Sequence, residues 1–167
     1  MIIRHDENIW ESWSFEKKSD LIHDYVTRYG DRNARRLDYG TGEFYTSTEM
    51  HILEKIYLHP GITVTELAKL SSRTKGAISQ IVKKLCEKEL VTKTSQGNNE
   101  KKQSLWVTTK GKKLNKLHMQ YDAEHAAEFF SKVSEYYSSE QMDAFFKIME
   151  TCFLLLDPNE DYPWTHG

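Results

Sequence analysis

Cysteine and proline are scarce in this chain of 167 residues, which holds two Cys and three Pro. Two thiols cannot build the disulfide framework of a small secreted domain. Cys86 and Cys152 both lie among apolar neighbours in helical patterns, where a thiol is most often a small core residue, so we expect no disulfide. The same surroundings disfavour a redox switch, because an oxidant sensor needs an exposed thiol with a lowered pKa.

Long apolar runs and enzyme motifs are also missing. No apolar stretch approaches the roughly 20 residues that span a bilayer. The opening residues, MIIRHDENIWESW, lack the apolar region of a signal peptide, so we expect a cytoplasmic protein. The sequence has no glycine-rich phosphate loop, no G-x-S-x-G and no H-E-x-x-H, and we therefore do not expect an enzyme.

The charge of the chain is unevenly distributed. Hydrophobic and charged fractions of 38% and 29% are typical of a globular chain, long enough for one core with a helical extension. From Arg73 to Lys116, twelve Lys or Arg stand against three Glu, a local charge of +9 in a chain of net charge -2. Such a basic segment in an otherwise acidic protein predicts a surface that binds a polyanion.

The segment from Thr74 to Leu90, TKGAISQIVKKLCEKEL, is predicted to be an amphipathic helix that contacts DNA. Its other face carries small and hydrogen-bonding side chains bordered by lysines. Base edges are read by hydrogen bonds and phosphates by charge, so that face suits a major groove. The apolar residues recur at the spacing of a single buried helix face: Ile78, Ile81, Val82 and Leu85.

Two shorter helices precede this segment. The sequences TSTE at 46–49 and TVTE at 63–66 match the capping box, in which two side chains satisfy each other's backbone N–H groups at a helix start. The helices are predicted to end near Leu58, before His-Pro-Gly at 59–61, and near Ser71. The second short helix, a tight turn and the Thr74 helix together predict a helix-turn-helix unit.

A β-hairpin is predicted to follow. Val91–Thr94 and Leu105–Thr108 have the composition of strands, and the polar stretch Gln96–Lys102, QGNNEKK, that of a turn. The hairpin would form a "wing" with Lys101 and Lys102 at its tip. Its position directly after the DNA-contacting helix would let these lysines reach the minor groove or flanking phosphates.

Further helices are predicted on both sides of this core. Residues 1–30, whose aromatic side chains include Trp10, Trp13, Tyr25 and Tyr29, are predicted to form a long amphipathic helix ending near Gly30. Residues 31–45 lack a sustained period and are predicted to be a connection. Helical spacing returns from Thr109 to about Lys132 and, after a capping box at Ser138 and Gln141, up to Leu156. The last helix is apolar around most of its circumference, which predicts contact with a partner subunit.

The predicted fold is therefore mainly α with a small β-wing. It consists of a winged helix-turn-helix lobe at 46–110 and a helical dimerisation region formed by 1–45 and 111–157. A polar tail occupies 158–167.

Residues 46–116 resemble the winged-helix core of the multiple antibiotic resistance regulator (MarR) family. The similar features are T-x-x-E-L-A in the first helix of the unit, TKGAISQIVKKL in the second, E-K-x-L-V before the wing and T-x-x-G after it. The resemblance implies a homodimeric transcriptional regulator, for example a repressor, that binds a pseudo-palindromic double-stranded operator and responds to an effector. This chain departs from the family at the wing, with Asn99 and Lys101 where Asp and Arg are usual, which predicts less discriminating minor-groove contacts.

The predicted DNA contacts fall into two groups. Side chains or backbone at the start of the second helix are expected at base edges: Thr74, Lys75, Gly76, Ser79 and Gln80. Cations around them are expected at phosphates: Arg73, Lys83, Lys84, Lys101 and Lys102.

Zinc is the sharpest hypothesis for the effector. The segment TSTEMHIL resembles the zinc-responsive adhesin-competence regulators of the same family, which implies His51, His118 and Asp122 as ligands, with Asp122 where those proteins have His. His125 lies one turn further along the same helix. Imidazole and carboxylate ligands together suit Zn²⁺, and Asp38 or Glu43 is a candidate fourth ligand.

Several alternatives stay open from sequence. The chain could be a winged-helix module that binds protein instead of DNA, and the His/Asp set could in principle form a hydrolytic metal centre. A phenolic ligand is a further possible effector. The operator, the regulated genes and the sign of regulation are not encoded in any pattern that we find.

Overall fold

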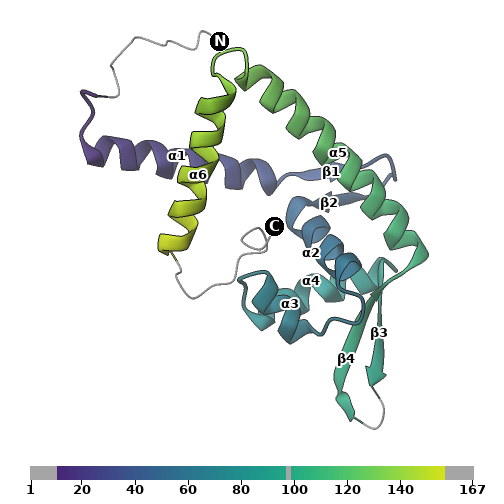
Figure 1. The fold of residues 1–167 in the computed structure, drawn as a ribbon. Coiled ribbons are helices and arrows are strands. Elements are labelled where there is room, and N and C mark those ends of the chain that lie inside the picture. The colour runs from purple at the N-terminus through teal and green to yellow at the C-terminus, as the bar shows by residue number, and fades with distance from the viewer. Residues whose placement is uncertain (1–10, 97–98, 157–167) are drawn as a thin grey trace. The chain divides into compact units, whose positions relative to one another are not determined.

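The structure is a computed structural model that describes residues 11–96 and 99–156 (Figure 1). Its contacts divide the chain into two compact units, one ending at Met119 and the other beginning at Gln120, and each is described by itself. The mainly helical fold with one wing hairpin confirms the predicted fold class. None of the described helices is long and apolar enough to cross a membrane.

Helix α1 (Phe15–Asn33) begins at Ser14, whose hydroxyl accepts a hydrogen bond from the N–H of Lys17. The predicted end near Gly30 was wrong by three residues, because the glycine continues the helix and Ala34 caps it. Trp13 precedes the helix, and Trp10 and the rest of 1–10 lie outside the described residues.

The predicted connection at 31–45 contains a hairpin instead. Strands β1 (Arg36–Asp38) and β2 (Phe44–Thr46) pair in antiparallel register. Asp38 Oδ1 accepts from the N–H groups of Thr41 and Gly42 at 2.8 and 3.1 Å, closing a turn that needs positive φ at both glycines, Gly40 and Gly42. Strands of three residues give too short an alternation to be recognised as a period.

Both predicted capping boxes are confirmed. Helix α2 (Ser47–Leu58) begins at Thr46, where the side chains of Thr46 and Glu49 each bond the other's backbone N–H. Helix α3 (Val64–Leu70) begins at Thr63 in the same way, with Glu66 as the partner. Helix α4 (Lys75–Glu87) follows after a turn that places Ser72 at a φ of 46°. These helices thus form the predicted helix-turn-helix.

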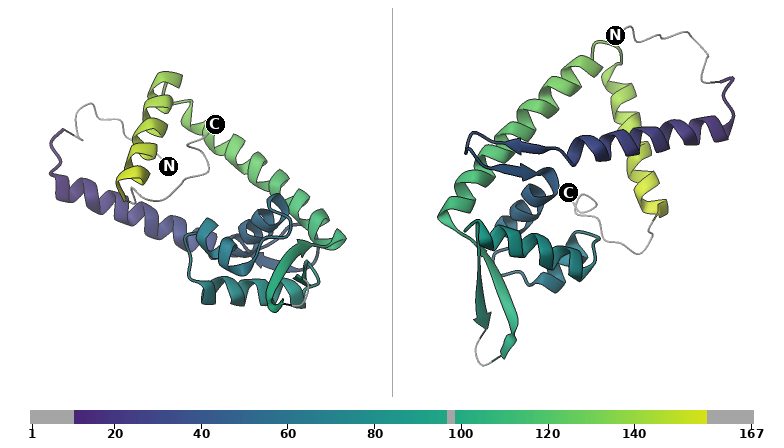
Figure 2. Two further views of the ribbon diagram at one scale, coloured as in Figure 1. Left: turned by 60° about the horizontal axis from the view of Figure 1, so that its bottom comes forward. Right: turned by 180° about the vertical axis from the view of Figure 1, so that it is seen from behind.

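The wing is longer than predicted. Strands β3 (Val91–Gln96) and β4 (Asn99–Val107) pair antiparallel, so the turn over 96–102 was wrong in extent and only 97–98 separate the strands. Backbone pairing continues through this polar sequence because a solvated hairpin needs no apolar face at its end. The hairpin projects from α2–α4 in Figure 1 and in the right view of Figure 2. Its base carries a bridge from Thr63 to Ser104.

The core of the first unit joins the helices to the wing base. Apolar side chains from β2, α2, α3, α4, β3, β4, the start of α5 and the residue before β3 form this core, and burial of this kind provides the main favourable term in folding. The members exposed by 2% or less are Tyr45, Met50, Ile52, Leu53, Ile56, Leu67, Ile78, Val82, Leu85, Leu90, Val91, Leu105 and Leu114.

Helix α5 (Thr109–Val133) begins in the first unit and ends in the second. Thr108 caps it by accepting from the N–H of Gly111 at 3.0 Å, and its own hydroxyl donates to the carbonyl of Glu89 at 2.7 Å. Helix α6 (Ser139–Leu156) has the predicted cap, since Ser138 and Gln141 bond each other. Cys152 lies exposed on α6, contrary to the expected core position.

Gly111→Ala tests the packing of α5 against the wing base. A Cβ at Gly111 would lie 2.2 Å from the carbonyl oxygen of Leu90 and 2.7 Å from a methyl of Val107. We expect this variant to lose about 3 kcal/mol of unfolding free energy in urea, the upper end of overpacking costs. Gly76→Ala is the matched control, because nothing lies within 4 Å of its added Cβ. Equal stability of the two variants would contradict the described contact.

Candidate nucleic-acid interface

Helix α4 is oriented by its apolar stripe. Ile78, Val82 and Leu85 are exposed by 1% or less, while Ile81 is partly buried at the margin. Thr74 forms the N-cap and accepts from the N–H of Ala77 at 3.2 Å. Because one face of the helix is fixed in the core, the opposite face is presented to solvent.

All the predicted DNA contacts of the α4 region lie on that open side. Gly76 has free space around its Cα hydrogens, so a partner can approach the backbone closely. The structure brings together, as exposed residues in and just before α4, Arg73, Thr74, Lys75, Gly76, Ser79, Gln80, Lys83 and Lys84. The arrangement offers hydrogen-bonding groups in a cationic border, the chemistry that base edges and phosphates require.

Two of these cations have protein partners as well. Lys83 Nζ lies 3.8 Å from a carboxylate oxygen of Glu87, and Lys84 Nζ lies 3.8 Å from one of Glu49. The Lys83–Glu87 pair is 69% and 61% exposed, so it contributes roughly 0–1 kcal/mol, whereas the Glu49 side chain in the second pair is only 8% exposed. A phosphate can therefore replace the carboxylate of Glu87 at Lys83 at little cost.

Lys101 and Lys102 lie within β4 instead of in the turn where the sequence placed them. The backbone pairing of Gln96 with Asn99 puts both lysines in the outer part of the wing.

The C-terminal end of α4 is attached to the β1–β2 hairpin by a network that sequence reasoning missed. Lys88, the C-cap, donates to the carbonyl of Phe44 at 3.0 Å, and its Nζ lies 3.9 Å from the centre of the Tyr45 ring. Lys110, at the start of α5, bonds Glu43 at 2.9 Å, and Lys88 lies 3.8 Å from Glu43. The sequence signal for this network is the opposite charge of Glu43 and of Lys88 and Lys110, which are far apart in the chain.

This network shifts two pKa values. The hydrogen bond from Lys110 holds the pKa of Glu43 below its ordinary value of 4.5, helped by the hydrogen bond from Tyr45. Burial raises the pKa of Tyr45 to about 12, and the hydrogen bond from its hydroxyl to Glu43 adds to the rise. Glu43 is therefore ionised, and Tyr45 neutral, over the physiological range.

The second candidate site brings together two histidines and a carboxylate of the first unit. Ligand atoms of His51, Glu54 and His118 all lie within 4.8 Å of one another. His51 Nδ1 lies 3.5 Å from Glu54, and the rings of His51 and His118 meet edge to face at 5.1 Å. His51 is exposed, whereas His118 is 1% exposed and also meets the ring of Tyr39. The group can thus be reached from solvent on the His51 side.

Glu54 was missed from the sequence, although its spacing of three residues from His51 on α2 was a readable signal. Asp122, named from the resemblance, is not in this group of ligand atoms. The two suggested fourth ligands, Asp38 and Glu43, are also outside this group. Asp38 accepts hydrogen bonds from the backbone N–H groups of Thr41 and Gly42, and Glu43 pairs with lysines. His125 stacks on Tyr121 with ring centroids 3.8 Å apart.

Comparisons with known proteins find similarity to transcriptional regulators. The family model described as "MarR family" matches residues 45–102. The chain is 29% identical over 134 residues to the uncharacterized HTH-type transcriptional regulator YhjH of Bacillus subtilis (strain 168), covering 75% of this chain and 77% of YhjH.

Two solved structures show the same fold. Streptococcus pneumoniae FabT, crystallised in complex with DNA, is similar with a TM-score of 0.65 and 19% identity, covering 84% of this chain and 98% of that one. The zinc-responsive MarR family member ZitR of Lactococcus lactis is similar with a TM-score of 0.63 and 17% identity, covering 86% and 99%.

The Glu43 network predicts a pH dependence of stability. A carboxylate with a lowered folded-state pKa adds stability above its unfolded pKa, and this contribution is lost as pH falls through the folded value. Urea unfolding should therefore show wild type more stable than Glu43→Gln at pH 7, with the difference shrinking below about pH 4.5. The exposed Glu150→Gln serves as a control with no such trend. A difference for Glu43→Gln that is independent of pH would contradict the ionic role.

Proposed function

We propose that this chain, a DNA-binding transcriptional regulator of the MarR family, works as a homodimer that reads a pseudo-palindromic operator and changes affinity with an effector. The observation that carries the DNA-binding mode is α4, whose buried stripe leaves a polar, cationic face open. In a dimer, two copies of α4 would enter successive major grooves one helical turn apart.

The contacts divide by chemistry. Gln80 can bond an adenine edge with both atoms of its amide, and Ser79, Thr74 and Lys75 offer further hydrogen bonds beside the close backbone approach at Gly76. Phosphates would be held by Arg73, Lys83 and Lys84 around α4 and by Lys101 and Lys102 of the wing. The lysines of the wing supply affinity more than discrimination, since they lack the planar fork of Arg.

The homodimer is supported by apolar side chains that a single chain leaves exposed. On α1, Ile22, Tyr25 and Val26 are exposed by 60% or more. In the second unit, rings of Phe129, Phe130, Phe145 and Phe146 lie against one another yet remain 37–53% exposed. Monomers rarely leave so many large apolar side chains exposed, and a second copy of the chain would cover them.

Operator binding as a function of salt tests the proposal. A duplex selected from random sequence should be retained by the dimer, and log affinity should fall linearly with log salt concentration. The Lys101→Ala, Lys102→Ala double variant should reduce the magnitude of the slope by roughly two per wing if each lysine neutralises one phosphate. Gln80→Ala should instead keep the slope and lose roughly 1–3 kcal/mol of sequence discrimination.

Binding without salt dependence, or a monomeric chain by light scattering, would contradict this function. Failure to retain any duplex would favour the winged-helix module that binds protein. An unchanged slope in the double lysine variant would remove the wing from the interface.

A second candidate function, zinc response, is favoured by the His51–Glu54–His118 group. Two imidazoles and one carboxylate form a nitrogen and oxygen donor set that Zn²⁺ accepts, and their ligand atoms all lie within 4.8 Å of one another. The similar fold of zinc-responsive ZitR supports the idea. Bound zinc would tie α2 to α5, and Asp122, one turn beyond His118, is the proposed further ligand.

Zinc titration of the full chain tests this candidate. Wild type should bind stoichiometric Zn²⁺ by calorimetry. His51→Ala should weaken binding by at least about tenfold, because mutating even a residue that only hydrogen-bonds a metal ligand lowers metal affinity 10–100-fold. His59→Ala, an exposed histidine outside the group, is the control. Comparing Glu54→Gln with Asp122→Asn shows whether one or both of these carboxylates bind the ion. Zinc binding that is equal in wild type and His51→Ala would exclude the site.

A further inference from the structure

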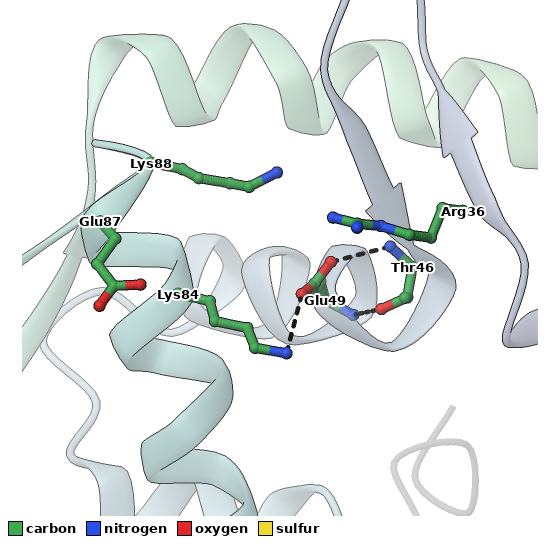
Figure 3. A pocket seen from close by; sticks show the side chains of 6 residues that line it. All are labelled: Arg36, Thr46, Glu49, Lys84, Glu87 and Lys88. Carbon is green, nitrogen blue, oxygen red and sulfur yellow. Dashed lines mark hydrogen bonds and ion pairs between the residues drawn. The ribbon is translucent and has the colours of Figure 1, made fainter.

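A half-open cavity of ≈ 380 Å³ lies beside the C-terminal end of α4 (Figure 3), and none of the proposed base contacts lines it. Its volume falls within the roughly 300–1,000 Å³ of small-ligand sites. The wall is formed by β1, the start of α2 and the last turn of α4, through Arg36, Thr46, Glu49, Lys84, Glu87 and Lys88.

Positive charge exceeds negative charge around this cavity. Glu49 is already engaged, since one carboxylate oxygen accepts from the N–H of Thr46 at 2.9 Å and the other faces Lys84. Glu87 is engaged by Lys83, which lies outside the wall. When the ion-pair partners of the wall residues are included, five cations stand against three carboxylates. The cations are Arg36, Lys83, Lys84, Lys88 and Lys110, and the carboxylates are Glu43, Glu49 and Glu87.

Two of the cations converge on one neutral atom. Arg36 Nη2 and Lys88 Nζ both donate to the carbonyl oxygen of Phe44, at 3.1 and 3.0 Å. In the described part of the chain Arg36 forms no ion pair. Figure 3 shows the guanidinium of Arg36 and the ammonium of Lys88 extending toward each other across the cavity. Like charges so placed repel, and an anion between them would remove the repulsion.

We propose that this cavity binds a small anion with two or more negative charges, a phosphate monoester or a di- or tricarboxylate, held between Arg36 and the ammonium groups of Lys84 and Lys88. The planar guanidinium matches two oxygens of such a group, and the lysines act as point charges. Thr46 offers a hydroxyl at the same wall.

Anion binding lowers operator affinity in this scheme, a regulatory role that rests on the proposed function. The anion draws Lys84 away from the DNA-facing border of α4 and adds negative charge beside it. Coupling between sites is reciprocal, so operator DNA weakens the anion by the same factor as the anion weakens DNA.

Calorimetry and thermal unfolding of the full chain with citrate and with inorganic phosphate, at constant ionic strength, test the proposal. A ligand that binds only the folded chain gives a saturable rise in unfolding temperature. Arg36→Gln should weaken binding about tenfold, the effect of one charge-assisted hydrogen bond. Arg35→Gln, the neighbouring arginine outside the cavity wall, should bind as wild type. If Arg36→Gln fails to fold, Lys84→Gln makes the same test of anion binding.

The possible results either support or contradict the anion site. Saturable binding that Arg36→Gln weakens and Arg35→Gln retains supports the site, and the stronger of the two probes shows whether carboxylate or phosphate is preferred. No saturable binding, or equal loss in both variants, overturns it. Operator binding by Arg36→Gln without any anion is measured in parallel. If the wild type does not bind operator DNA, the proposed function is contradicted. The anion site is tested separately, because the anion titration does not depend on DNA.

Discussion

Burial of one stripe on α4 is the constraint on which the interface depends. Ile78, Val82 and Leu85 cannot leave the core without exposing apolar area worth about 25 cal/mol per Å². A helix has only one direction opposite such a stripe. Gln80 and Ser79 therefore face outward because of the packing of the opposite helix face. DNA binding then needs no rearrangement of the helix, which favours affinity by keeping its ordering cost low.

A second constraint acts at the ends of α4. The N-terminus is capped by Thr74, whereas the C-terminal turn is held through Lys84 and Lys88 to residues of α2 and the β1–β2 hairpin. Glu49 serves both helices, as it completes the cap of α2 and faces Lys84 of α4. Lysines near a helix C-terminus also offset the dipole of the helix. The position of α4 in its lobe is thus set by charged contacts, which salt weakens, as well as by apolar packing.

Features set by local chemistry could be predicted from the sequence. Capping boxes fixed the starts of α2 and α3 because their partners are three residues apart, and the apolar period of α4 identified its buried side. The β1–β2 hairpin was missed because its stability comes from Asp38 and two glycines in a turn, not from alternation. Glu54 and the Lys88 network were missed because their partners are brought together only by tertiary packing, across separations that no periodicity reports.

Strong ion pairs within the protein would compete with DNA phosphates for the cations on the open face of α4. Lys83 lies 3.8 Å from the exposed carboxylate of Glu87, while Glu43 and Lys110 bond at 2.9 Å. Long, exposed pairs contribute little to stability and are exchanged readily for phosphates. Short pairs with additional hydrogen bonds, such as the one at Glu43 with its lowered pKa, resist exchange. The chain therefore separates its cations into a loosely paired set facing the proposed groove and a firmly paired set that holds the lobe together.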